Sequence, residues 1–353
     1  TGRGAQRLEE ATAAPAQTLH RLLKYDGATN KFAFHRNNPL DVDLVLVDEV
    51  SMVDLSLMSS LLDALPPHCA LILVGDADQI PPVGAGQILQ SMIESERFTT
   101  VRLTEVHRQR QMSQIKINAH RINHGEIPQP TGLDHDGDFH YIPVHNALHA
   151  KQVITKLVKE IIPQRYGITD RGEIQVLTPL NRGSLGTLEL NFDLQQMRAE
   201  NLSERDRIEG FGQNFHFGDR VMVSKNDYKK DVFNGDIGFV RGIHHSAQFI
   251  EVQFDNRSVD FHFDELDRLT LAYAISIHKS QGSEYRAVIV VLTQEHLPLA
   301  QRHLIYTAVT RGKEQVFLVA EPSALEIAVR SDANNRRWQK LTELLTEPSQ
   351  LQP

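Results

Sequence analysis

Two apolar runs of this sequence end in acidic residues. Residues 44–47 (Leu-Val-Leu-Val) are followed by Asp48 and Glu49, and residues 71–74 by the sequence Gly-Asp-Ala-Asp-Gln at 75–79. A continuous apolar run that ends in acid is typical of a buried parallel strand, which delivers its last residues to the carboxyl edge of a sheet. Because α/β proteins bind ligands at that edge, two such runs predict a nucleotide site.

The residue types at these strand ends suit phosphate chemistry. A first carboxylate, Asp48, can hold Mg²⁺ through water, and a second, Glu49, can orient and deprotonate the water that attacks a γ-phosphate. The alternative is that Asp48 and Glu49 simply end a strand and begin a turn. The acidic residues at 75–79, after the second run, favour the catalytic interpretation.

Length and composition set the class of protein. A chain of 353 residues with 41% hydrophobic and 23% charged residues predicts a soluble globular protein of about two domains. A single cysteine excludes an intrachain disulfide and a cysteine-rich metal site. No apolar stretch approaches the ~20 residues of a membrane span, and the first residues are not a signal peptide, so we expect a cytoplasmic protein with no membrane partner.

The charge balance limits how the protein could contact nucleic acid. A formal net charge of -8 argues against coating DNA nonspecifically, because that mode needs a broad basic face. A narrow groove that holds a few nucleotides remains compatible with this charge. Any nucleic-acid contact is therefore expected to be local.

Hydrophobic patterning divides the chain into distinct segments. Residues 24–40 contain a turn flanked by alternating aromatic residues, which indicates a hairpin, and residues 125–138 form a polar link where we place the first domain boundary. Short strands separated by Asn-Gly-Asp and Asp-Asn turns occupy residues 211–268 and predict a small antiparallel barrel inserted into the second domain. The α/β pattern then resumes at residues 271–279, 287–292 and 314–320.

Six motifs, in order, give the chain a family resemblance. They are Thr-Gly-Arg at 1–3, Asp-Glu at 48–49, Gly-Asp-Ala-Asp-Gln at 75–79, Val-His-Arg-Gln at 106–109, Ile-His-Lys-Ser-Gln-Gly-Ser-Glu at 277–284 and Tyr-Thr-Ala-Val-Thr-Arg at 306–311. Their order resembles that of superfamily 1 DNA helicases. The sequence of residues 271–284 and 232–236 is similar to that of the RecD-type branch, the exonuclease V alpha-subunit family.

The resemblance implies an α/β fold of two RecA-like parallel-sheet domains, with ATP in the cleft and single-stranded DNA across their tops. The first domain is expected at 1–130, with the strand-separating hairpin at 24–40. The second is expected at 131–210 and 269–353, and a small SH3-like β-barrel is expected as an insertion at 211–268.

The resemblance also implies roles for individual residues around ATP and Mg²⁺. Asp48 would bind Mg²⁺, Glu49 would be the catalytic base, and Gln79 would sense the γ-phosphate. Arg108 and Arg311 would be arginine fingers, since a planar guanidinium can follow charge spread over phosphate oxygens. The implied nucleotide-binding set is Asp48, Gln79, Arg108, Gly282, Glu284 and Arg311. Either arginine, taken alone, could instead be an ordinary surface charge.

For single-stranded DNA, the resemblance implies contacts that hold phosphates without reading sequence. The implied residues are Thr1, Gly2, Arg3, Thr18, His20, His278, Lys279 and Gln281. The alternative for His20 and His278 is helix capping or hydrogen bonding in the core. The hairpin at 24–40 could likewise be a plain connection between two helical segments.

One family motif is absent from the chain. No Gly-x-x-x-x-Gly-Lys-Ser/Thr loop occurs, and Gly312-Lys313 lacks both the earlier glycine and the following hydroxyl. In the family this phosphate-binding loop lies upstream of the Thr-Gly-Arg motif. We expect either a fragment of a longer helicase or a missing strand and loop supplied by another chain, and in both cases poor ATP hydrolysis by these residues alone.

Two functions remain open on these residues. The first is the C-terminal motor portion of an ATP-dependent helicase that moves 5′ to 3′ on single-stranded DNA and acts at junctions with duplex. The second is a noncatalytic helicase-like subunit that binds single strands or partner proteins. Retention of both carboxylates and both arginines favours the first. Partners would include other subunits of a helicase-nuclease complex or the missing N-terminal segment.

Overall fold

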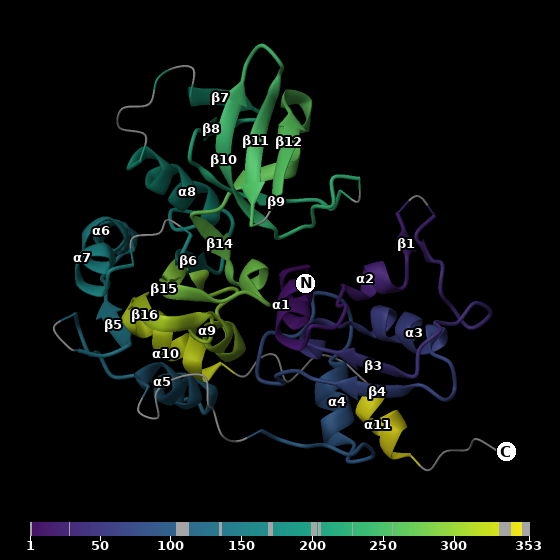
Figure 1. Ribbon diagram of the computed structural model, residues 1–353. Coiled ribbons are helices and arrows are strands. Elements are labelled where there is room, and N and C mark those ends of the chain that lie inside the picture. Colours follow the sequence, from purple (N-terminus) through teal and green to yellow (C-terminus); the bar gives the residue numbers. More distant parts are fainter. Residues whose placement is uncertain are drawn as a thin grey trace. The chain divides into compact units, whose positions relative to one another are not determined.

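The computed structural model describes residues 2–27, 29–103, 113–133, 136–168, 172–198, 203, 206–227, 229–255, 257–331 and 340–347. Contacts divide the chain into two compact units (Figure 1). The first holds Arg3–Arg110 and Asp332–Pro353, and the second holds Gln111–Ser331. No helix in the described ranges is long and apolar enough to cross a membrane.

The first unit contains a parallel pair of strands, β3 (Leu44–Val47) and β4 (Ala70–Leu73). The chain runs from β3 through η1 (Val50–Met52) and α3 (Leu55–Ala64) to β4, as a parallel connection requires. Val45 and Val47 point into a core with Leu61 of α3. The register pairs the last residues of both strands, so their carboxyl ends lie level.

The other elements of the first unit are mostly short helices. They are α1 (Gly2–Thr12), α2 (Leu19–Leu22), the antiparallel strands β1 (Tyr25–Asp26) and β2 (Lys31–Phe32), α4 (Ile88–Glu94) and α11 (Leu341–Thr346). The expected hairpin is thus present, with β1 and β2 as its paired strands. Near α11, the Arg97 guanidinium donates to the carbonyl of Thr346 at 2.9 Å. The C-terminal helix therefore belongs to the first unit, although residues 269–353 were predicted in the second domain.

The second unit is built on a five-stranded parallel sheet in the order β14-β6-β15-β16-β5. Its strands are β5 (Phe139–Pro143), β6 (Ile174–Thr178), β14 (Ala274–Ser276), β15 (Tyr285–Leu292) and β16 (Gly312–Ala320). Its helices are α5 (Gln114–Asn123), α6 (Ala147–Lys156), the π-helical η2 (Leu157–Ile161), α7 (Ile162–Tyr166), α8 (Thr187–Gln196), α9 (Arg302–Val309) and α10 (Pro322–Arg330). The predicted α/β class with parallel sheets is confirmed.

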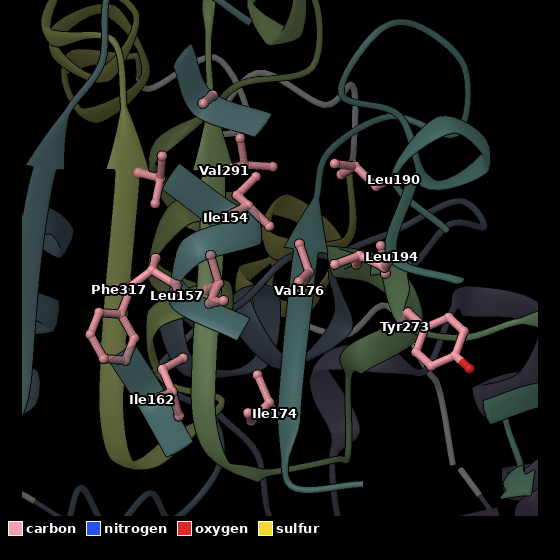
Figure 2. Packing of buried hydrophobic residues seen from close by; sticks show 14 of the residues in the cluster. Ile154, Leu157, Ile162, Ile174, Val176, Leu190, Leu194, Tyr273, Val291 and Phe317 are labelled. Atoms are coloured by element: carbon pink, nitrogen blue, oxygen red, sulfur yellow. The ribbon is translucent and has the colours of Figure 1, made fainter. Parts of the chain in front are cut away.

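The core of the second unit lies between this sheet and the helices that pack on it. Figure 2 shows Ile154 and Leu157 from the α6–η2 segment directed at Val176, Val291 and their neighbours on the strands. Every residue of β6 is buried, as are the last six of β15. Burial on both faces explains why residues 287–292 of β15 form a continuous apolar run, whereas β6 contains two buried polar residues, Gln175 and Thr178, whose side chains donate to backbone carbonyls.

Helix α5 packs within the second unit. Its apolar residues Ile115, Ala119 and Ile122 are buried, and its start is fixed by Asp138, whose carboxylate accepts from the amides of Gln114 at 2.7 Å and Ile115 at 3.2 Å. The predicted boundary at residue 130 placed this helix in the first domain. The contacts place α5 in the second unit instead, because this helix packs against α9.

An antiparallel sheet lies between the two parts of this parallel sheet in sequence. Its order is β12-β11-β10-β9-β13, formed by β9 (Arg220–Val223), β10 (Ile237–His244), β11 (Phe249–Phe254), β12 (Arg257–His262) and β13 (Leu269–Leu271). A hairpin, β7 (Arg207–Gly210) and β8 (Gln213–His216), precedes it, and η4 (Phe263–Arg268) leads into β13. A separate core surrounds Val221, Val240 and Ile250. Closure into a barrel stays a prediction.

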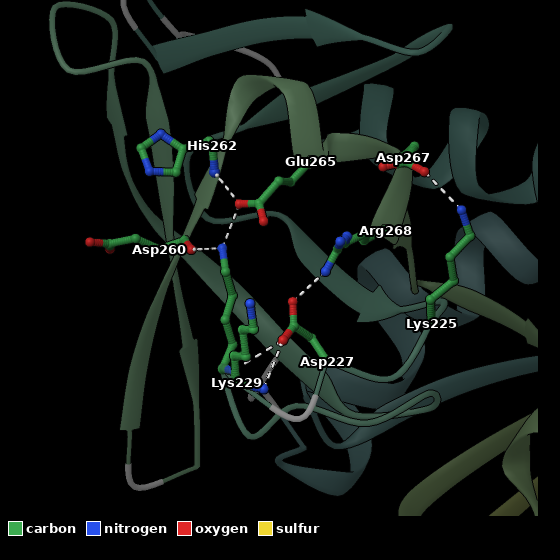
Figure 3. A network of polar contacts seen from close by, with 9 residues as sticks. Lys225, Asp227, Lys229, Asp260, His262, Glu265, Asp267 and Arg268 are labelled. Atoms are coloured by element: carbon green, nitrogen blue, oxygen red, sulfur yellow. Dashed lines mark hydrogen bonds and ion pairs between the residues drawn. The ribbon is translucent and has the colours of Figure 1, made fainter. Parts of the chain in front are cut away.

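A polar network ties the β9–β10 loop to η4 (Figure 3). The carboxylate of Asp227 accepts from the backbone amides of Lys229 at 3.0 Å and Lys230 at 3.1 Å and pairs with Arg268. Lys230 in turn pairs with Glu265. These pairs order a loop that has few apolar side chains of its own.

Asp219 joins the antiparallel sheet to the parallel one. Its carboxylate accepts from the backbone amide of His216 at 2.7 Å, the side-chain amide of Gln195 on α8 at 2.5 Å and the hydroxyl of Tyr273 at 2.7 Å. Burial raises the pKa of this carboxyl group, and the three donors oppose that rise. Beside it, the buried Arg220 donates to the carbonyl of Ile174 in β6 at 3.0 Å.

We expect Asp219→Ala to destabilise the protein, because it leaves three buried donors without an acceptor. The free energy of unfolding should fall by about 3 kcal/mol, and Asp219→Asn should fall by less because it keeps one acceptor oxygen. Urea unfolding measures both values. The exposed Asp260→Ala is the control and should stay within ~0.5 kcal/mol of the parent. Equal stability of Asp219→Ala and the control would show that this carboxylate does not hold the junction.

Candidate nucleotide and DNA sites

The end of β3 places the two predicted catalytic carboxylates differently. Asp48 is exposed and accepts from the backbone amide of Glu49 at 2.8 Å, whereas Glu49 is half-buried. Glu49 has φ 56° and ψ 41°, a left-handed conformation that few non-glycine residues adopt. The next amide, of Val50, donates to the carbonyl of Val74 at 3.0 Å. This turn separates the side chains of two adjacent acids, and such strain is concentrated at functional sites.

The end of β4 holds Gln79 beside the same edge. Asp76 accepts from the backbone amide of Asp78 at 2.9 Å and from the side-chain amide of Gln79 at 3.4 Å. Gln79 is 9% exposed, and its side-chain oxygen Oε1 is buried without a hydrogen-bond partner among the described residues. An unpaired buried acceptor costs about 1–3 kcal/mol, so its retention points to a ligand or water that it contacts in use.

Ser51 was missed by the sequence analysis. Its hydroxyl is buried and has no hydrogen-bond partner within the described ranges, and it lies on η1, three residues after Asp48. The backbone amides of Val50 and Ser51 would lie 3.0 and 3.1 Å from a Cβ atom at Gly75, so the two strand ends are closely packed. A serine after two acids has no spacing that would have distinguished it from a turn residue.

Thr18 and His20, predicted to contact DNA, lie at the start of α2. The Thr18 hydroxyl caps this helix by accepting from the amide of Arg21 at 3.3 Å. The His20 ring packs against Tyr25 and Phe32 of the hairpin. Both side chains therefore have structural contacts. Helix capping, which was the alternative interpretation for His20, is made here by Thr18.

In the second unit, the predicted DNA-binding residues follow β14. Ser276 caps the short helix η5 (Ile277–Ser280) and accepts from the amide of Lys279 at 3.4 Å. Gln281 is buried, while His278 is partly exposed. Partial desolvation lowers the pKa of the Lys279 ammonium group. The Lys279 side chain is therefore exposed, whereas most of the neighbouring residues of η5 are buried.

Arg311 lies near Gly282 and Glu284. Its guanidinium donates to the carbonyls of Thr307 at 3.1 Å and Ser283 at 3.3 Å, and it is 5% exposed. Glu284 immediately precedes β15 and Arg311 immediately precedes β16, and the register pairs the first residues of these strands. The structure thus brings together three of the predicted nucleotide-binding residues, at the amino ends of neighbouring strands.

Some predicted residues cannot be placed. Thr1 and Arg108 lie outside the described residues, as does the side chain of Arg3, and Gly2 is the first residue of α1. Among the described residues, no group of three or more His, Cys, Asp or Glu side chains could hold a metal ion. One exposed carboxylate such as Asp48 nevertheless fits Mg²⁺, which binds proteins through one or two carboxylates and completes its shell with water and phosphate oxygens.

Family models match three parts of the chain. The AAA domain model matches residues 1–144, the ATP-dependent RecD-like DNA helicase SH3 domain model matches 190–254, and the UvrD-like helicase C-terminal domain model matches 271–319. The ATP-dependent RecD2 DNA helicase of Deinococcus radiodurans is 36% identical over 335 residues, which are 93% of this chain. The RecBCD enzyme subunit RecD of Mycolicibacterium smegmatis is 30% identical over 364 residues, or 94% of this chain. The chain is RecD-like.

Solved structures agree on the fold. Pif1 helicase from Bacteroides in complex with ADP-AlF3 and single-stranded DNA matches with a TM-score of 0.53 at 19% identity, over 92% of this chain and 82% of that one. Pif1 helicase from Candida albicans matches with a TM-score of 0.54 at 16% identity, over 98% and 86%. The RecD-like chain spans 43% of the length of the Deinococcus relative and 63% of the Mycolicibacterium one.

The RecD-like chain has a further polar cluster at the carboxyl ends of β6 and β15, around the fully buried His296. The amide of Thr293 donates to Nδ1 of His296 at 2.9 Å, so the ring proton lies on Nε2, which is 3.3 Å from the Thr178 hydroxyl. That hydroxyl donates to the carbonyl of Leu185 at 2.7 Å. Burial lowers the pKa of His296 to about 4.

This cluster predicts a loss of stability in acid. Between the unfolded pKa of about 6.5 and the folded pKa of about 4, the unfolded RecD-like chain binds a proton that the folded chain does not. The contribution of His296 to the free energy of unfolding is therefore complete above that range. It decreases as the pH is lowered, by about 2 kcal/mol at pH 5. Urea unfolding at pH 7.5 and 5 measures the loss.

The His296→Asn variant should show a smaller change between the two pH values, because asparagine keeps an acceptor for the amide of Thr293 and does not titrate. The exposed His68→Asn is the matched control and should keep the parent's pH dependence. If His296→Asn loses as much stability in acid as the parent, another group causes the loss.

Proposed function

We propose that this RecD-like chain is the C-terminal motor portion of an ATP-dependent DNA helicase that moves 5′ to 3′ along single-stranded DNA. The relative from Deinococcus radiodurans is described as an ATP-dependent DNA helicase, which supports the reaction class. In this proposal the hairpin β1–β2 separates the strands of a duplex at its junction with single-stranded DNA.

The observation that carries the proposal is the buried side-chain oxygen of Gln79, which has no partner in the described part of the chain. It lies after β4, at the same edge as Asp48 and Glu49 after β3. Asp48 would hold Mg²⁺, and Glu49 would orient the attacking water and take its proton. Bound ATP supplies the phosphoryl group, and Gln79 would respond to that group.

Arg311 supports phosphoryl transfer in a different way. Backbone carbonyls fix its guanidinium in the folded chain, so little side-chain entropy is lost when it meets a phosphate. Arg108, the second predicted finger, would act with it, and Gly282 and Glu284 would border the nucleotide. Positioning and charge stabilisation of this kind account for most catalysis of phosphoryl transfer.

The proposed DNA contacts are to phosphates. Lys279 offers a cation at the surface of η5, with His278 and Gln281 beside it, and Thr1, Gly2, Arg3 and Thr18 would contribute from the amino-terminal part of the chain. Such contacts suit translocation because they do not depend on sequence. The Pif1 relative of known structure is described in complex with single-stranded DNA, which fits this class of ligand.

We further propose that a polypeptide segment outside these 353 residues covers one face of the β3–β4 sheet. Leu44, Leu46, Ile72 and Val74 are 54%, 45%, 45% and 42% exposed, although the opposite face is packed. Parallel sheets are normally covered on both faces, and two-stranded sheets are rarely stable alone. The covering polypeptide would carry the phosphate-binding loop, either on a longer form of this chain or on another chain.

The first test of the function is Glu49→Gln in a longer protein that includes the phosphate-binding loop. DNA-stimulated ATP turnover should fall by at least two orders of magnitude, since the water loses its base, while ATP binding is unchanged. Steady-state ATPase and nucleotide titration measure these. Glu347→Gln, a surface carboxylate of the same unit, should behave as the parent. Normal turnover in Glu49→Gln would support the noncatalytic alternative.

The second test is Leu46→Asn, made both in the 353-residue chain and in the longer protein. In the 353-residue chain the change should cost under ~0.5 kcal/mol of unfolding free energy, because this side chain is exposed. In the longer protein, where the face is covered, it should cost about 2 kcal/mol or more. Leu188→Asn, at an exposed position of the second unit, is the control for both. Equal costs in the two proteins would show that this face stays uncovered.

A further inference from the structure

Three aromatic rings meet where the hairpin leaves α2. The His20 ring centroid lies 5.4 Å from that of Tyr25, with the planes at 85°, and 5.7 Å from that of Phe32. Tyr25 and Phe32 are 5.2 Å apart and are directly paired across the two strands. These separations are typical of stabilising edge-to-face and tilted aromatic pairs.

The hairpin depends on contacts of this kind because its strands are short. Two residue pairs join β1 to β2, and an isolated hairpin of two strands is marginal in water. The side chains near its tip add the Tyr25 hydroxyl bond to Asn30 at 2.7 Å and the Thr29 hydroxyl bond to Asp26 at 2.8 Å. At the base, the carbonyl of the fully buried Leu23 accepts from the amide of Ala33 at 3.1 Å.

His20 is the ring of the three that lies on a different element. It belongs to α2, whose start is capped by Thr18, whereas Tyr25 and Phe32 belong to the hairpin. A ring on the helix that packs on both strands can transmit the orientation of the helix to the hairpin. A flexible hairpin would bend when it meets the duplex, whereas a hairpin held by these ring contacts is expected to keep its direction.

The chemistry of His20 fits packing better than phosphate binding. Although His20 is exposed, partial desolvation lowers its pKa while the charge of Asp54 acts in the opposite direction, so protonation of the ring is disfavoured. A neutral imidazole gives up the attraction to phosphate that a protonated one would have. The two ring contacts, in contrast, do not need a charge.

We propose that His20 is a positioning residue that fixes the β1–β2 hairpin through ring packing, and that it does not bind a DNA phosphate. This inference deepens the proposed function and rests on it, because the hairpin is taken there as the element that separates strands. It gives His20 a role in unwinding and none in translocation.

The first experiment measures the hairpin itself and requires no enzyme activity. Amide hydrogen exchange of residues 25–34 is followed in the 353-residue chain for the parent, His20→Ala, His20→Phe and His20→Lys. Loss of two ring contacts should speed exchange in this segment about tenfold in His20→Ala and His20→Lys, and His20→Phe should restore protection. Thr18 stays unchanged throughout, so the cap of α2 is kept. Parental protection in His20→Ala would overturn the proposal.

The second experiment uses the longer protein with its phosphate-binding loop. Strand displacement should drop at least tenfold in His20→Ala and recover in His20→Phe, while the ATPase kcat and the single-stranded DNA concentration for half-activation stay at parental values. If His20 instead binds phosphate, His20→Phe fails as His20→Ala does, His20→Lys is active, and both failing variants need more DNA for half-activation. That outcome overturns the proposal. The parent protein could fail to unwind DNA while hydrogen exchange still becomes faster in His20→Ala and is restored in His20→Phe. That result would refute the proposed function and leave the packing role of His20 intact.

Discussion

Parallel sheets are normally covered by apolar groups on both faces, and much of the structure of this RecD-like chain follows from that constraint. In the second unit the constraint is met within the described residues: helices pack on the sheet and β6 is fully buried. In the first unit it is met on one face, where α3 covers Val45 and Val47. The same constraint puts polar residues at the strand ends, because only there can they reach solvent or a ligand.

The burial of apolar helix faces also determines which helix belongs to which unit. Helix α5 joins the second unit because Ile115, Ala119 and Ile122 form one buried face, and α11 joins the first because it packs on α4. Neither assignment can be read from the order of the chain. The polar link at residues 125–138 suggested a boundary, yet Asp138 within it caps α5 and so fixes the link to the second unit.

The sequence was sufficient for the parts of the fold that depend on strong local patterns. The apolar runs at residues 44–47 and 287–292 correspond to β3 and β15, and the acidic residues predicted to follow two strands do lie at the ends of β3 and β4. It was insufficient where a side chain has a partner far along the chain. Asp219, which bonds Tyr273, and Ser51, whose burial depends on the packing of two strand ends, have no local signature.

His20 shows a different limit of sequence reasoning. His20 was predicted from the family resemblance to contact DNA, and the packing of its ring on Tyr25 and Phe32 depends on how the hairpin folds back toward α2. The aromatic residues of the hairpin were visible in the sequence, but nothing in their spacing identified the third ring. A contact between elements that are adjacent in sequence can therefore be as hard to predict as a distant one.

The buried polar groups of this chain differ in how completely they are hydrogen-bonded. Asp219 receives three donors, so its interactions are complete and its role is to join two sheets. Gln79 and Ser51 each keep a buried oxygen without a partner in the described ranges, as do Ser91, Gln175 and Tyr285 elsewhere in the chain. An unpaired buried acceptor lowers stability, so those at a strand end are expected to contact a ligand or water. Because buried oxygens without a partner also occur away from these strand ends, the proposed nucleotide site rests on Gln79 and Ser51 together with the acidic residues that follow β3 and β4.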